Sequence, residues 1–107
     1  MPVIHIEFDD SKVIDEDAHQ LCVAAQKIVS EVTKITDVFV YGNSARIKIG
    51  IAPIEIFVSI SAHKVPSVEG MLAELKNRFS DWKQGVRFKH PINLTLTPMP
   101  WKFETGI

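Results

Sequence analysis

Hydrophobic and polar residues alternate in two parts of the chain, which is the pattern of β-strands with one buried face. In residues 2–8 (PVIHIEF), the two isoleucines and the phenylalanine share one face. In residues 53–61 (PIEIFVSIS), every second residue is again apolar, and Phe57 adds bulk to the opposite face. We therefore predict a half-buried strand at 2–8 and a central strand at 53–61.

Two longer stretches repeat their apolar residues at intervals of three and four, the spacing of one face of an α-helix. The first runs from about 16 to 35, after a cluster of acidic residues that suits a helix N-terminus. The second begins at Pro66 and Ser67, and Gly85 is its expected end. The residues that should face the core are Leu21, Ala25, Ile28, Val32 and Ile35 in the first helix and Val68, Leu72, Leu75, Phe79 and Trp82 in the second.

Three shorter segments have the character of extended structure. Residues 38–41 (VFVY) and 45–51 (ARIKIGI) are expected to be extended, with a turn or bulge between them at 42–44 (GNS). Residues 92–97 (INLTLT) alternate once more and predict a last strand. The tail PMPWKFETGI is broken by prolines and should be irregular or a short edge segment.

The order of elements is therefore β-α-β repeated, with approximate halves at 1–51 and 52–107. Helical crossovers of this kind join parallel strands with a right-handed turn. We predict a single α/β domain (α+β in some schemes) over 1–107, in which a four-stranded, mainly parallel sheet carries both helices on one face. The other face would remain exposed, and association of several copies is the simplest way to cover it.

Composition narrows the classes of partner. The net charge is −1 and the basic residues are scattered, which argues against a nucleic-acid partner. No stretch approaches the roughly 20 apolar residues of a membrane span, and acidic residues stand where a secretory signal needs an apolar run, so we expect a cytoplasmic protein without a membrane partner. Cys22 has no disulfide partner, and His19, His63 and His90 share no metal-ligand spacing with it. We expect no metal and no cofactor.

A Met-Pro start leads directly into an alternating strand, and two β-α-β units fill the rest of the 107 residues. This arrangement resembles the tautomerase superfamily, and within it the chain is most similar to the 5-carboxymethyl-2-hydroxymuconate isomerase branch. The resemblance covers nearly the whole chain, including IFVSISAHKVPSVEGMLAELKNRF and the closing INLTLTPM. It implies a homotrimer with a central barrel of sheets, and a keto-enol tautomerase or isomerase of the kind used in aromatic compound degradation.

The resemblance also implies that Pro2 is the catalytic base, freed when the initiator Met1 is removed. A free N-terminal amine titrates near 8, and an apolar pocket with nearby cations lowers its pKa. Such an amine can take a proton from an enol or an α-carbon and return it elsewhere, which is tautomerisation. A structural role fits Pro2 as well, because proline is tolerated at the first residue of a strand. If Met1 is retained, the proline nitrogen is an amide and cannot act as a base.

The substrate of such an enzyme is a small carboxylate, an unsaturated keto or hydroxy acid, which needs a cationic partner. Arg46 is the candidate, because it falls where the isomerase branch carries an arginine-rich second-strand segment. That branch tends to have another arginine two residues earlier, where this chain has Ser44. The short 4-oxalocrotonate tautomerases use an arginine in the first helix, where this chain offers only Lys27 and Lys34.

Further side chains are candidates for the wall of the pocket or for auxiliary roles. Arg46 and Lys48 also fit a solvated strand face. The aromatic wall candidates, named below, and His5 fit the core or a subunit interface equally well. The alternative functions are a non-catalytic tautomerase-fold oligomer that binds a small ligand or a protein partner, and an unrelated ferredoxin-like interaction domain. The wall candidates are Tyr41, Phe57, Trp101 and Phe103, and the auxiliary candidates are His5 and Lys48.

Overall fold

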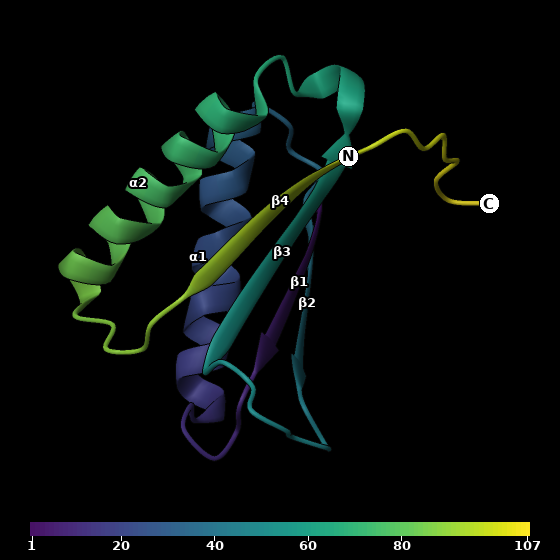
Figure 1. Ribbon diagram of the computed structural model, residues 1–107. Helices are drawn as coiled ribbons and strands as arrows, with labels where there is room; N and C mark the ends of the chain where they lie inside the picture. The colour runs from purple at the N-terminus through teal and green to yellow at the C-terminus, as the bar shows by residue number, and fades with distance from the viewer.

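Four strands and two long helices follow one another as two β-α-β units (Figure 1). The computed structural model describes residues 1–107. The predicted fold class is confirmed. The elements are β1 (Val3–Phe8), α1 (Asp15–Thr33), β2 (Phe39–Ser44), β3 (Ile54–Ser61), the short 3-10 helix η1 (Ala62–Lys64), α2 (Val68–Val86) and β4 (Asn93–Met99).

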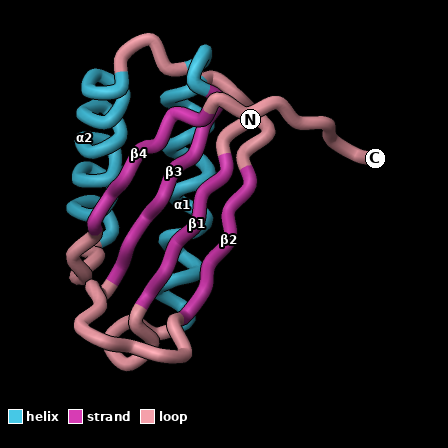
Figure 2. Tube along the Cα trace, turned by 45° about the vertical axis from the view of Figure 1, so that its right-hand side comes forward, coloured by secondary structure: helices cyan, strands magenta, loops and turns pink.

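The strands form one sheet in the order β2-β1-β3-β4 (Figure 2). Each β-α-β unit contributes a parallel pair, β1 with β2 and β3 with β4, and the two units meet through an antiparallel pairing of β1 with β3. Val3 therefore lies opposite Ser59, while Phe8 lies opposite Ile54. We call the edge where β1 and β2 begin and β3 and β4 end the Pro2 end of the sheet. The other edge is the Phe8 end.

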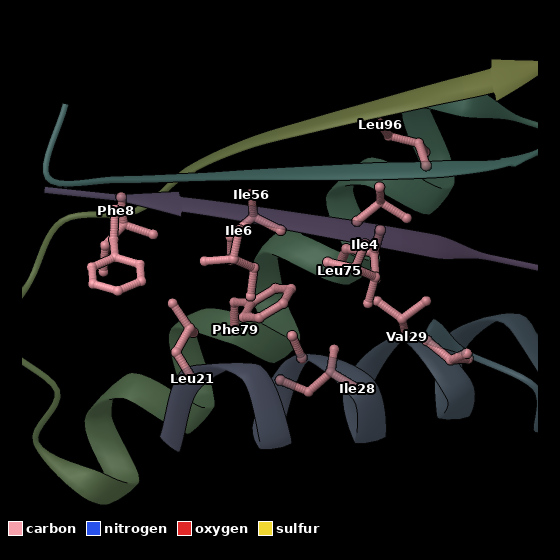
Figure 3. Packing of buried hydrophobic residues seen from close by; sticks show 14 of the residues in the cluster. Ile4, Ile6, Phe8, Leu21, Ile28, Val29, Ile56, Leu75, Phe79 and Leu96 are labelled. Carbon is pink, nitrogen blue, oxygen red and sulfur yellow. The ribbon is translucent and has the colours of Figure 1, made fainter. Parts of the chain in front are cut away.

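Both helices pack on one face of the sheet and enclose the core with it (Figure 3). Every second residue of β1 and β3 points toward the helices and is buried, as the alternation predicts. Each large apolar side chain buried in this way stabilises the fold by about 1.5–3 kcal/mol before conformational entropy is counted. The largest fully buried side chains include Ile4, Ile6, Leu21, Ile54, Ile56, Ile60 and Leu75.

The helices end close to the predicted positions, with one correction. Ser67 caps α2, because its Oγ accepts a hydrogen bond from the Gly70 N–H at 3.1 Å. Gly85 does not end this helix, which continues to Val86 and closes with Arg87 in the left-handed conformation at φ 58°. Lys34 ends α1 in the same way at φ 61°, so neither helix uses a glycine to stop.

The second strand differs from its prediction. The expected turn at 42–44 belongs to β2, and the expected strand at 45–51 lies in the loop that joins β2 to β3. The reason is the length of β1, which ends at Phe8, so that nothing is left for the later residues to pair with. The alternating Ile47 and Ile49 are consequently 73% and 88% exposed.

The face of the sheet that points away from the helices is open in a single chain, as predicted (Figure 2). We call it the open face. It carries the exposed aromatic side chains of Phe39, Tyr41 and Phe57. Neither α1 nor α2 combines the length and the apolar character that a membrane-spanning helix needs.

Asp9 closes the turn that follows β1. Its N–H donates to the Pro53 carbonyl at 2.9 Å, and its own carbonyl accepts from the Val13 N–H at 2.9 Å. The carboxylate accepts hydrogen bonds from the hydroxyl of Ser11 at 2.6 Å and from the Ser11 N–H at 3.0 Å. These hydrogen bonds favour the charged form and hold the pKa of Asp9 below its ordinary value of 3.8.

We expect Ser11→Ala to lower the free energy of unfolding at neutral pH, because the carboxylate of Asp9 loses its hydroxyl partner. A lowered pKa stabilises the folded state above the unfolded pKa, and this contribution disappears as the pH falls through the folded pKa. Urea unfolding of both proteins should therefore show a difference that shrinks as the solution is acidified below about pH 4. In an Asp9→Asn background the effect of Ser11→Ala should not change over that range, and a pH-independent effect in the native background would contradict the assignment.

Candidate active site

Pro2 stands immediately before β1, and its side chain is among the fully buried ones. Its carbonyl accepts a hydrogen bond from the Phe39 N–H at 3.2 Å, which ties the start of β1 to the start of β2. Because Val3 pairs with Ser59, Pro2 continues the register opposite Ile60, which is itself fully buried. The proline ring therefore lies in apolar surroundings on the helix side of the Pro2 end.

The chemistry of the Pro2 nitrogen depends on Met1. While Met1 is attached, the nitrogen is a tertiary amide without a proton to exchange. Once Met1 is removed, it is a secondary amine held rigidly by the ring. Apolar surroundings disfavour the protonated form of such an amine and so favour its use as a base.

A lysine and a histidine that residue patterns do not mark as anchors, Lys64 and His63, belong to the Pro2 end. β3 runs antiparallel to β1, so its last residue, Ser61, and the following η1 lie at the end where β1 begins. The side chains of His63 and Lys64 in η1 are exposed and take part in no ion pair. The signal that would have found them is the antiparallel pairing of β1 and β3, which residue patterns alone do not reveal.

Trp101 also belongs to the Pro2 end. Its indole Nε1 donates a hydrogen bond to the Oγ of Ser61 at 2.8 Å, and Ser61 is only 3% exposed. Phe103 meets Trp101 edge to face, with ring centroids 6.3 Å apart, but it is exposed on the tail that leaves the body of the molecule (Figure 1). Of the two predicted wall residues in the tail, only Trp101 is fixed against the sheet.

The other two wall candidates lie with His5 in the middle of the open face. Tyr41, His5 and Phe57 are neighbours in the register across β2, β1 and β3. The rings of His5 and Tyr41 are stacked, with centroids 5.2 Å apart and an interplanar angle of 17°. His5 is three residues from Pro2, about 10 Å along the strand. We call these three side chains the aromatic row, and within one chain they are not part of the surroundings of Pro2.

Arg46 and Lys48 lie at the Phe8 end, because the loop that carries them follows β2, which runs parallel to β1. The six residues of a strand separate this end from Pro2 by about 20 Å. Lys48 is paired with Asp10 at 2.7 Å, and this hydrogen-bonded carboxylate raises the pKa of the lysine. Arg46 is exposed and takes part in no ion pair. A single chain therefore brings neither cation to Pro2.

The remaining titratable side chains form no second cluster that could act as a functional site. No three His, Cys, Asp or Glu side chains are placed to hold a metal ion. His90 contacts Asp17 at 3.0 Å and links the first turn of α1 to the segment before β4. Cys22 is half-buried, and burial raises the pKa of its thiol. Pro2 and its neighbours are therefore the best candidate site.

The sequence matches no known family profile and no curated protein. Its structure, in contrast, is similar to many solved ones. A macrophage migration inhibitory factor-like protein from Entamoeba histolytica is 19% identical, with a TM-score of 0.64 over 96% of this chain and 95% of that one. A fused 4-OT in the form of a wild-type asymmetric trimer is 13% identical, with a TM-score of 0.66 over 97% and 92%. An FG41 malonate semialdehyde decarboxylase inhibited by 3-bromopropiolate is 13% identical, with a TM-score of 0.64 over 98% and 91%.

These structures are members of the tautomerase superfamily, and the chain has a tautomerase-like fold over almost its whole length. The neighbours come from different branches, so the likeness extends to the superfamily fold and not to the 5-carboxymethyl-2-hydroxymuconate isomerase branch in particular. At sequence identities of 13–19%, the similarity between this chain and these structures shows a common fold alone.

The bond between Trp101 and Ser61 predicts a measurable coupling. Trp101→Phe keeps an aromatic ring but removes the N–H, and Ser61→Ala removes the acceptor. Each change should lower the free energy of unfolding by about 1 kcal/mol, the usual net value of a hydrogen bond. The double variant should cost less than the sum of the two, by about 0.5–1.5 kcal/mol in a urea-unfolding cycle. Additive effects would mean that the indole does not depend on Ser61.

Proposed function

We propose that the chain is a tautomerase or isomerase that moves a proton within a small unsaturated keto or hydroxy carboxylic acid, with Pro2 as the general base and acid. The observation that carries the proposal is the fully buried proline at the head of β1, in a fold shared with tautomerase-superfamily structures. The proposal requires that Met1 is removed in the active protein. The finer assignment, an isomerase of the 5-carboxymethyl-2-hydroxymuconate type in the degradation of aromatic compounds, rests on the sequence resemblance.

The proposed reaction needs one amine with two protonation states. The uncharged Pro2 nitrogen takes a proton from the enol oxygen or the α-carbon of the substrate, and the resulting ammonium returns it to the other position. The ring keeps the nitrogen in one place throughout. An amine whose pKa is near the working pH is efficient in both directions, and the apolar surroundings of Pro2 favour such a value.

The substrate carboxylate would be held by cations from two sources. Lys64, with His63 beside it, lies at the Pro2 end of the same chain. Arg46 lies at the opposite end, so it would serve the Pro2 of another copy. Pro2 lines none of five grooves found on the surface of the single chain, and we propose that its pocket is completed by self-association.

Self-association would also account for the open face. We propose a homotrimer, as in the fused 4-OT trimer, in which the aromatic row of Tyr41, His5 and Phe57 is buried between copies. Trp101 would exclude water from the Pro2 end, while Phe103 and Lys48 would act only across an interface. We propose that the protein is cytoplasmic and that its reaction uses no cofactor.

The role of Pro2 can be tested with an enol substrate such as phenylenolpyruvate, followed by its ultraviolet absorbance. Intact mass should show loss of Met1. Pro2→Ala should lower kcat/KM by at least about 100-fold, the usual contribution of a positioned base. In the native protein kcat/KM should rise with pH through the pKa of the free Pro2 amine, which we expect below the ordinary value of a secondary amine, because only the uncharged nitrogen accepts a proton.

The matched control inserts one alanine between Met1 and Pro2. Met1 is still removable, and the proline ring is kept, but its nitrogen becomes an amide. This variant should unfold at the same denaturant concentration as the native chain and be inactive. If it remains active, or if Pro2→Ala turns over the enol at the native rate, Pro2 is not the base.

Individual variants can test the two proposed anchors of the substrate carboxylate, Lys64 and Arg46, independently. Lys64→Ala and Arg46→Ala should each raise KM for a carboxylate substrate by about 10-fold or more, since a hydrogen bond to a charged group is worth about 1.5–3 kcal/mol. Lys76→Ala, which removes an exposed lysine of α2, is the control and should leave KM unchanged. An effect of Lys64→Ala without one of Arg46→Ala would place the anchor within one chain. If neither variant raises KM, the carboxylate is held elsewhere.

The second candidate is a non-catalytic oligomer that binds a small ligand or a protein partner. The observation that favours it is the complete burial of Pro2, which a structural proline at the head of a strand would also show. Retention of Met1 in the mature protein, together with an intact oligomer, would support this second function.

A further inference from the structure

Ser61 is a buried residue at the Pro2 end whose hydroxyl proton has no acceptor. It is only 3% exposed, and its Oγ accepts a hydrogen bond from the indole Nε1 of Trp101 at 2.8 Å. In none of the side-chain hydrogen bonds of the chain is the Ser61 hydroxyl the donor. A serine hydroxyl has one proton to donate in addition to its acceptor lone pairs. Since buried polar groups are normally paired, this free donor points to a ligand.

The indole of Trp101 restricts the direction in which this proton can point. Because the indole N–H points at the Ser61 Oγ, the hydroxyl proton has to turn away from it. Ser61 pairs with Met99 of β4, and Trp101 follows Met99 by two residues, so the indole reaches Ser61 from the β4 side. The proton is thereby directed toward the other neighbour of β3 in the sheet, which is β1.

The chain begins on the β1 side of Ser61. Continued by two residues, the antiparallel register of β1 with β3 places Met1 opposite Ser61. Their neighbours Pro2 and Ile60 are fully buried on the helix side, so Met1 and Ser61 belong to the open face. Figures 1 and 2 show the N-terminus beside the point where β4 gives way to the C-terminal tail. Opposite residues of such a pair have Cβ atoms about 4.5–5.5 Å apart, so Met1 stands within reach of the Ser61 hydroxyl.

Removal of Met1 changes what faces the Ser61 hydroxyl. The Pro2 nitrogen becomes the end of the chain, and the place of Met1 is left to a ligand. This place is then bordered by the nitrogen from β1 and by the hydroxyl from β3. An oxygen atom of a ligand that lies there can contact both groups at once.

We propose that the Ser61 hydroxyl donates a hydrogen bond to the keto or enol oxygen of the substrate, and that Trp101 is the positioning residue that turns the hydroxyl toward it. This inference rests on the proposed function, since it places that oxygen beside the Pro2 nitrogen. When the nitrogen takes the proton of the enol O–H, the electron pair of that bond stays on the oxygen, and the Ser61 donor stabilises the resulting charge. The ammonium gives the proton to the carbon, and the oxygen becomes a carbonyl.

Two ligands that differ in this oxygen test the contact without relying on turnover. Phenylpyruvate carries the 2-keto oxygen, whereas 3-phenylpropanoate lacks it. In a chain produced with Pro2 as its first residue, calorimetric titration should show that Ser61→Ala weakens phenylpyruvate binding by about 5- to 10-fold, the usual effect of one hydrogen bond. The affinity for 3-phenylpropanoate should not change. Ser59→Ala removes a hydroxyl two residues earlier on β3, and this matched control should alter neither affinity.

The positioning role of Trp101 has its own variant. Trp101→Phe keeps an aromatic ring but lets the hydroxyl rotate, so it should weaken phenylpyruvate binding by a smaller factor than Ser61→Ala does. The affinity for 3-phenylpropanoate should again be unchanged. In a Ser61→Ala background, Trp101→Phe should have no further effect on the ratio of the two affinities. A purely structural tryptophan would alter both affinities in either background.

Activity measurements separate this inference from the proposed function. Ser61→Ala should lower kcat for phenylenolpyruvate by about 100-fold, because a donor to the oxygen acts most strongly when negative charge develops there. If Pro2→Ala leaves turnover unchanged while Ser61→Ala still discriminates between the two ligands, the base is wrong and the Ser61 contact stands. Equal weakening of both ligands by Ser61→Ala, or no weakening of either, would overturn the contact. So would an unsubstituted chain that binds phenylpyruvate no more tightly than 3-phenylpropanoate.

Discussion

The antiparallel pairing of β1 with β3 is the constraint on which the rest of the structure depends. Ile4 lies opposite Val58 and Ile6 lies opposite Ile56 across this pairing, and all four side chains are buried against the helices. The pairing joins two β-α-β units so that the second unit runs opposite to the first. It thereby brings the start of β1 and the end of β3 together, and it sends the loop after β2 to the far end of the sheet.

Periodicity predicts the elements that make this sheet, because it reports which face of a segment is buried. It predicts β1, β3 and both helices well, since each has a core face that the sequence repeats regularly. It fails at residues 45–51, where Ile47 and Ile49 alternate but find no partner strand. A residue pattern describes a segment's preference, whereas a strand also needs a neighbour, and the length of β1 decides how far that neighbour extends.

The same limit applies to the candidate site. The proposal for Pro2 rests on its place at the head of a strand and on the resemblance. Lys64 becomes a candidate only in the structure, because its relation to Pro2 exists only through the antiparallel pairing that places η1 at the same end. Arg46 shows the converse, since a residue on the expected second strand proves to lie about 20 Å from Pro2 within one chain. The residue type indicates which chemistry a side chain can perform, and the topology decides which side chains lie close enough to act together.

The position of Pro2 combines two requirements that oppose each other. Its ring is fully buried, and such burial is what would keep an amine uncharged. A substrate must nevertheless reach the nitrogen, and Pro2 is not among the residues that line the five grooves considered above. In the proposed oligomer, a second copy would resolve this opposition, because an interface could form the wall of a pocket beside the nitrogen while the ring stays buried. The open face, with its exposed Phe39, Tyr41 and Phe57, is a surface from which such an interface could be built.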